Sequence, residues 1–222
     1  MLVQNRMTPD PVRVAADASI ADALRLVRQH RVRHLPVLED GTLVGIVSDR
    51  DLRLAMPSPL GMETPEFVAL VEGTRVDAIM ARDVITTGPT DTLEDAAVRM
   101  TRSRVGALPV VDAEGALIGL ISETDVLRAF VEVFTASGPA SRLEVALDDR
   151  PGELARAVRV IGEECRLNIA SIMVGRASPG ARRTAVVHVA TIDPREVIAT
   201  LERNGIEVGW PSLEADLRRM GA

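Results

Sequence analysis

An internal repeat constrains this chain more than any other feature, because residues 7–55 and residues 80–129 carry one pattern twice. The string GIVSDRD that begins at Gly45 lies over GLISETD, which begins at Gly119, after a one-residue insertion in the second copy. A repeat of this size cannot bury a sheet on its own. We therefore expect the two copies to pack face to face as a pseudo-twofold pair.

Each copy is predicted to fold as a β-α-β-β-α unit. Ser19 with Asp22, and Thr92 with Asp95, have the spacing of a capping box and precede apolar residues at helical spacing. Two β-rich runs follow in each copy, separated by an acidic residue and a glycine that favour a tight turn. These runs are residues 35–38 and 43–47 in the first copy and residues 110–111 and 117–121 in the second. A second helix is expected to open at the Ser-x-x-Asp of the repeated string.

The chain after the repeat is predicted to form a separate domain. Its apolar pattern has the order β-α-β-β-α-β, which is typical of a ferredoxin-like fold. The fold class is therefore mixed α+β, with some α/β character in the repeats. The predicted boundaries are residues 1–76 for the first copy and a connecting segment with a short helical run, 77–134 for the second copy, 135–141 for a linker, 142–210 for the ferredoxin-like domain, and 211–222 for a helical tail.

The Ser-x-x-Asp steps are the first candidates for chemistry. Ser48 and Ser122 stand where a strand meets a helix, so that a hydroxyl, free backbone N–H groups and the helix dipole would converge on a phosphate. Asp51 and Asp125, one turn later, would accept hydrogen bonds from ribose hydroxyls. The alternative is that each step is only another capping box, and the short string alone favours that alternative.

Both copies resemble CBS motifs through the Ser-x-x-Asp string, the Leu-Pro-Val step and the capped helix that precedes it. Tandem CBS motifs bind AMP, ADP, ATP or related adenosyl ligands in the clefts between the copies. The resemblance implies that Ser48, Asp51, Ser122 and Asp125 contact phosphate and ribose, and that Leu35, Pro36, Leu108 and Pro109 border the adenine. Arg50 of the first copy is replaced by Thr124, and His34 is replaced by Ala107, so the first site is expected to hold phosphate more tightly.

The last domain resembles ACT domains through DRPGEL, which begins at Asp149, and LNIASI, which begins at Leu167. In that family the loop between the first strand and the first helix faces a dimer partner and binds an amino acid. The resemblance implies an amino-acid site made by Asp149, Gly152, Asn168 and Ile169. Some amino-acid-binding members have a histidine where this chain has Leu147, so a domain that only dimerises is an alternative of equal weight.

Composition narrows the class of function. A net charge of −6 and a pI near 5.2 argue against a general nucleic-acid binder. The single cysteine, Cys165, cannot form an intrachain disulfide, and neither a secretory leader nor an 18-residue apolar span is recognisable, so we expect a cytoplasmic protein that does not enter membranes. Since tyrosine is absent and aromatic residues are few, a bound base would be held by aliphatic side chains and backbone.

The sequence shows neither a nucleophile paired with a base nor a metal-ligand spacing among its histidines. We therefore expect no catalytic residues, no metal and no cofactor beyond a regulatory adenylate. A CBS pair followed by an ACT domain resembles proteins of the acetoin-utilisation type. The expected function is a homodimeric ligand sensor that signals to an unidentified regulated protein. The alternatives are an assembly scaffold with vestigial ligand sites and a nucleotide-processing enzyme.

Overall fold

The computed structural model describes residues 1–56, 72–134, 138–175 and 182–210 of the chain. The chain divides into two compact units, Met1–Ala129 and Phe130–Ala222. The sequence predictions for residues 66–71, for the turn at 178–180 and for the tail at 211–222 lie outside the described residues.

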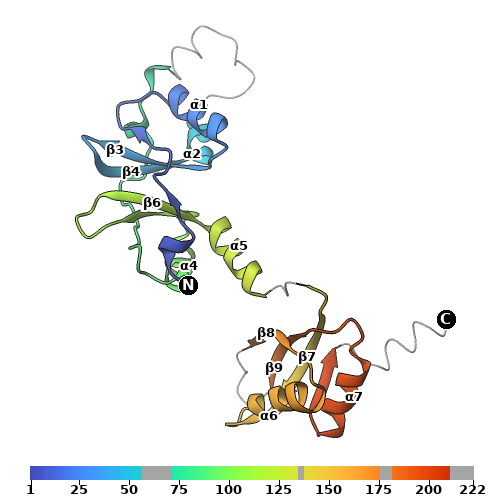
Figure 1. Cartoon of the computed structure of the whole chain (residues 1–222). Coiled ribbons are helices and arrows are strands. Elements are labelled where there is room, and N and C mark those ends of the chain that lie inside the picture. The colour runs from blue at the N-terminus through green and yellow to red at the C-terminus, as the bar shows by residue number, and fades with distance from the viewer. Residues whose placement is uncertain (57–71, 135–137, 176–181, 211–222) are drawn as a thin grey trace, which may run out of the picture. The chain divides into compact units, whose positions relative to one another are not determined.

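The first unit contains two three-stranded sheets. One sheet has the order β2 (Val14–Ala15), β3 (His34–Glu39), β4 (Thr42–Ser48), and the other has the order β1 (Thr8–Pro9), β6 (Leu117–Ser122), β5 (Ala107–Val111). Within the described ranges its helices include α1 (Ile20–His30), α2 (Asp49–Leu54), α4 (Leu93–Ser103) and the start of α5 (Glu123–Phe134), with short 3-10 turns η1 (Val3–Asn5) and η3 (Val76–Ala78). Figure 1 shows the two sheets as inner layers, with α1 and α4 on opposite outer sides.

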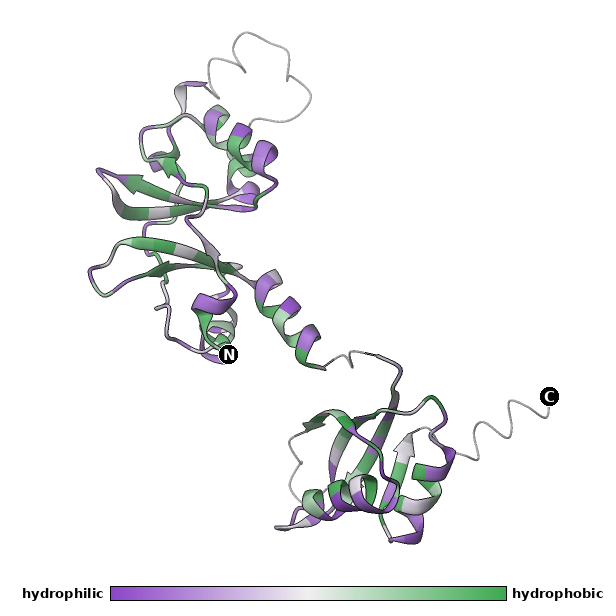
Figure 2. Cartoon of the chain, in the orientation of Figure 1, coloured by the Kyte–Doolittle hydropathy of each residue, from purple (hydrophilic) through white to green (hydrophobic). Residues whose placement is uncertain are grey.

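The predicted capping boxes determine where the first helix of each copy begins. The Ser19 hydroxyl accepts a hydrogen bond from the Asp22 N–H over 3.1 Å, and Thr92 accepts one from Asp95 over the same distance. Each such cap is worth about 1 kcal/mol. The helices then bury one apolar face, as the hydropathy colouring of Figure 2 indicates. The fully buried side chains on these faces include Ile20, Ala23, Leu93 and Ala96.

The two copies exchange their first segments, which the sequence did not predict. Strand β1 lies at the start of the first copy but pairs antiparallel with β6 of the second copy. In the same way Ala81, which lies at the start of the second copy, pairs with Ile46 on β4 of the first. The side chains of Val3 and Val76, which belong to these exchanged segments, are completely buried. Since each segment completes the other copy, the two copies form one folding unit.

The second unit is an antiparallel four-stranded sheet with helices on one face. Its strands have the order β10 (Glu207–Trp210), β7 (Ser141–Leu147), β9 (Arg183–Val189), β8 (Ile169–Val174). Helix α6 (Glu153–Arg159) continues into a π-helical turn, η4 (Val160–Glu164), and α7 (Arg195–Arg203) follows β9. This is the ferredoxin-like arrangement that the apolar pattern predicted.

Alternate residues of β7 and β9 form the core of the second unit with the helices. The buried set is Leu143, Val145, Leu147, Ala157, Val160, Ile161, Ala185, Val187, Val189, Val197, Ile198, Leu201, Ile206 and Val208. After α7 the chain turns at Gly205, whose φ of 69° lies in the left-handed region that favours glycine, as expected for a helix C-terminus. None of the helices in the described ranges is long and apolar enough to cross a membrane.

Candidate ligand cleft

Both Ser-x-x-Asp steps form complete capping boxes. In the first copy the backbone N–H and the hydroxyl of Ser48 both donate to Asp51 Oδ2, over 2.9 and 2.6 Å, and the Asp51 N–H donates to Ser48 Oγ over 3.2 Å. Ser122 and Asp125 repeat this pattern at 3.0, 2.6 and 3.3 Å. The capping role that the string alone favoured is therefore confirmed. The capping hydrogen bonds of Asp51 end at Oδ2, so its other carboxylate oxygen, Oδ1, takes no part in them.

A cleft of about 770 Å³ opens beside the first of these capping boxes. Cavities that bind small molecules usually have volumes of about 300–1,000 Å³. The cleft is lined by Arg33, His34, Ile46, Ser48, Asp49, Arg50, Asp51, Leu54, Ala81, Arg104, Val105, Gly106, Ala107 and Glu123. It lies between the two copies, as the sequence resemblance implied, since the residues from Arg104 onward belong to the second copy.

The charged groups that line the cleft fall into two sets. Two of the three carboxylates are engaged: Asp49 forms an ion pair with Arg53 at 2.9 Å, and Asp51 belongs to the capping box. By contrast, neither Arg50 nor Arg104 has a carboxylate partner in the part of the chain that the structure describes. The cleft therefore presents guanidinium groups that are available to an anion.

His34 lies at the start of β3, half-buried against the second copy. A β-carbon built on Gly106 would lie 3.3 Å from both Cε1 and Nε2 of this imidazole, so glycine keeps that contact open. Burial lowers the pKa of His34 below its usual value, and the nearby Arg33 lowers it further, against the opposing charges of Asp51 and Glu123. At neutral pH His34 is therefore an uncharged hydrogen-bonding group in the cleft.

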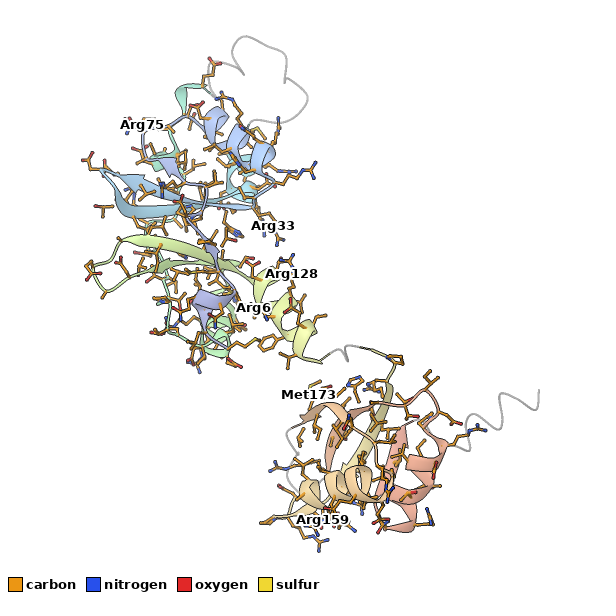
Figure 3. All side chains as sticks on the ribbon, viewed as in Figure 1. Arg6, Arg33, Arg75, Arg128, Arg159 and Met173 are labelled. Carbon is orange, nitrogen blue, oxygen red and sulfur yellow. The ribbon has the colours of Figure 1, made fainter. Side chains whose placement is uncertain are left out.

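The predicted second site differs from the first. Ser122, Thr124 and Asp125 do not line this cleft. The guanidinium of Arg33, a first-copy residue labelled in Figure 3, instead donates a hydrogen bond to the hydroxyl of Thr124 on the first turn of α5. Comparison of the copies had placed an arginine only at Arg50. In the structure the guanidinium of Arg33, which belongs to the first copy, lies beside Thr124, the residue of the second copy that corresponds to Arg50.

The residues expected beside an adenine are not on the wall of the cleft. Leu35 and Leu108 are completely buried, and Pro36 and Pro109 are buried next to them in β3 and β5. The cleft has a different aliphatic wall, which consists of Ile46, Leu54, Ala81, Val105 and Ala107. The repeat pattern did not point to these residues or to the charged groups Arg33, Asp49, Arg104 and Glu123. The alignment of residues 31–34 with residues 104–107 could have pointed to Arg33, Arg104, Val105 and Ala107.

In the second unit, the four residues of the expected amino-acid site do not line one common hollow. Asp149 lines a hollow of about 420 Å³ near the start of α6 and forms an ion pair with Arg183 at 2.7 Å. Gly152 adopts a φ of 92° as the N-cap of α6. Asn168 is exposed at the start of β8, where its carbonyl accepts a hydrogen bond from the Ala190 N–H, and Ile169 packs against the core. Of the four predicted residues, only Asp149 lines the hollow.

Comparisons with known proteins agree with the repeat. The family model for the CBS domain matches residues 3–58 and 76–132. An uncharacterised protein of Methanocaldococcus jannaschii, MJ1426, is 36% identical over 155 residues, which cover 59% of this chain and 92% of the relative.

Solved structures of CBS-pair proteins are also similar to this chain. The structure of CBSX2 from Arabidopsis thaliana has a TM-score of 0.52 and 36% identity, and covers 60% of this chain and 95% of that one. A structure of CBSX2 in complex with AMP has a TM-score of 0.50 and 34% identity, and covers 60% of this chain and 98% of that one. Each of these matches accounts for about three-fifths of the present chain.

Proposed function

Because this chain belongs to the CBS-domain family, we propose that its first unit is a regulatory sensor that binds an adenine nucleotide in the cleft between the two copies. The observation that carries the proposal is the juxtaposition of Asp51 with the unpaired guanidinium groups of Arg50 and Arg104 in one cleft. The complex of CBSX2 with AMP supports an adenylate as the ligand.

Each part of a nucleotide has a matching surface in the cleft. Oδ1 of Asp51 can accept hydrogen bonds from ribose hydroxyls, because the capping hydrogen bonds use only Oδ2. Arg50 can form paired hydrogen bonds with phosphate oxygens. The aliphatic side chains of Ile46, Val105 and Ala107 can cover the faces of the base, which fits a chain with few aromatic residues.

The phosphate contact does not depend on a helix dipole. Helix α2 is only six residues long, and the Asp51 N–H in its first turn already donates to Ser48. Side-chain guanidinium groups are therefore the main source of positive charge for the ligand. This differs from the expectation that Ser48 itself would be the principal phosphate contact.

We test the proposed function by titrating the full chain with AMP, ADP and ATP in a calorimeter, with GMP as the control base. Saturable binding of an adenylate without its hydrolysis would support a sensor. Turnover of ATP or AMP to a product would support the enzyme alternative instead. If no adenylate binds or raises the melting temperature, the scaffold alternative is favoured.

For the second unit we propose an ACT-type role, namely self-association and the capture of an amino acid near Asp149. The sheet has helices on one face only, and its edge strands β8 and β10 have no described neighbour on their outer sides. Such edges and faces are commonly covered by a second copy of the same chain. A CBS pair joined to such a unit is the arrangement of the acetoin-utilisation type, and the signal would pass to a separate regulated protein.

A further inference from the structure

We propose that the cleft prefers a nucleoside di- or triphosphate to a monophosphate, because Arg33, Arg50 and Arg104 are positioned to bind a phosphate chain together. This inference rests on the proposed function and concerns the class of ligand that the same cleft selects. All three arginines line the cleft, and they come from three separate segments: the chain before β3, helix α2 and the C-terminal end of α4.

The three guanidinium groups are not held by carboxylates. Some other arginines of the first unit are, such as Arg53 on Asp49 and Arg99 on Asp91, at 2.9 and 2.8 Å. In the described chain, Arg50 and Arg104 have no ion-pair partner, and Arg33 has only the neutral hydroxyl of Thr124. In a chain of net charge −6, three such arginines around one concave surface indicate an anionic ligand.

The number of arginines exceeds what one phosphate needs. A guanidinium binds phosphate most strongly through two parallel hydrogen bonds, and a single terminal phosphate has three oxygens to offer. Three guanidinium groups that come from separate segments find more oxygens and more negative charge on a chain of phosphates than on a single phosphate. Each additional phosphate also adds negative charge that the cluster can neutralise.

Arg33 is the residue that can distinguish the ligands. Its hydrogen bond to Thr124 is made to a neutral acceptor, whereas a phosphate oxygen carries a negative charge and also attracts the guanidinium electrostatically. A phosphate chain that reaches Arg33 can therefore displace Thr124. A ligand too short to reach it leaves the bond to Thr124 intact and gains nothing from this residue.

The acidic residues of the cleft do not cancel this preference. Asp49 is neutralised by Arg53, and Asp51 is hydrogen-bonded to Ser48. Glu123 remains as the third carboxylate, and its charge acts on His34, as does the charge of Asp51. The acidic charge of the cleft therefore lies beside His34, and there the ribose hydroxyls can donate to Asp51. The phosphates, which are negatively charged, are expected to bind to the arginines instead.

The test is calorimetry on the full chain with AMP, ADP, ATP and inorganic tripolyphosphate, in EDTA so that no metal ion takes part. We expect ATP to bind about tenfold more tightly than AMP, with a steeper loss of affinity as salt is added. Arg33→Gln should weaken ATP binding about tenfold and change AMP binding less than twofold, and Arg104→Gln should also weaken ATP binding about tenfold. Arg102→Gln is the matched control, because it removes the same charge two residues from Arg104 outside the cleft.

Thr124→Val provides an opposite variant, since it removes the acceptor that holds Arg33. It should strengthen ATP binding a fewfold and leave AMP binding unchanged. Equal affinities for AMP and ATP, or equal losses for both ligands in Arg33→Gln, would overturn the inference while the adenylate sensor stands. If tripolyphosphate binds and no adenylate does, the proposed adenylate sensor is wrong, but the inference that the arginines bind a phosphate chain is supported. If nothing binds, both are wrong.

Discussion

The side chain of Met80 lies directly over Gly45, so that a methyl group added to the glycine would overlap the methionine sulfur. Met7 lies over Gly119 in the same way. Each methionine belongs to the exchanged segment of the opposite copy, and each glycine lies on the strand that receives it. These two contacts are where the copies interlock, and they explain why a glycine occurs in both repeated strings.

Gly45→Ala is expected to destabilise the first unit by about 1–3 kcal/mol, the usual cost of overpacking a core. The free energy of unfolding in urea measures this loss. Met80→Ala should also destabilise the protein by leaving a cavity. The double variant should lose less than the two single changes together, because each change makes room for the other. If the losses of unfolding free energy in the two single variants add up to that of the double variant, the contact between Met80 and Gly45 is not the cause of the destabilisation.

Asp51→Ala is expected to weaken adenylate binding by about 1.5–3 kcal/mol, since it removes a charged acceptor of hydrogen bonds. Asp125→Ala is the matched control. It breaks an identical capping box, but Asp125 does not line the cleft, so its effect on binding should be smaller. Calorimetric titration of both variants decides the matter, and equal losses of affinity would contradict the assignment of the ligand to this cleft.

Acid should destabilise the first unit through His34. Because the pKa of this imidazole is lowered in the folded state, the unfolded chain binds the proton more readily. The free energy of unfolding should therefore fall as the pH drops below the ordinary histidine value of about 6.5. Urea titrations at several pH values should show a weaker pH dependence in His34→Gln. His30→Gln, at the exposed end of α1, serves as the control and should keep the dependence of the parent.

The chain is expected to be a dimer at micromolar concentration, with the contact on the second unit. Strand β8 lies at a sheet edge and carries Met173 and Val174, which are 40% and 37% exposed. A charge placed at the centre of such a contact opposes association, so Met173→Asp should shift the protein toward the monomer. Sedimentation velocity measures both species. A parent mass near the 23.9 kDa of one chain would refute the prediction.

The amino-acid sequence by itself determined the repeat, the capped helices, the strand pairs and the order of elements in the second unit. These features depend on the spacing of residues within one segment. Ser19 caps α1 because Asp22 is three residues away, and β7 alternates because every second side chain points into the core. Such patterns can be read without knowing what lies across the molecule.

Only the tertiary structure decided which side chains meet across the two copies. The exchange of β1, the contact between Arg33 and Thr124 and the entry of Arg104 into the cleft join residues that are far apart in the chain. The Leu-Pro steps were misassigned for the same reason. An apolar pattern predicts that Leu35 is buried, but it does not tell whether the residue packs in the core or lines a ligand cleft. The physical reason is that hydrophobic burial is non-directional, so the partner of each face depends on packing between distant segments.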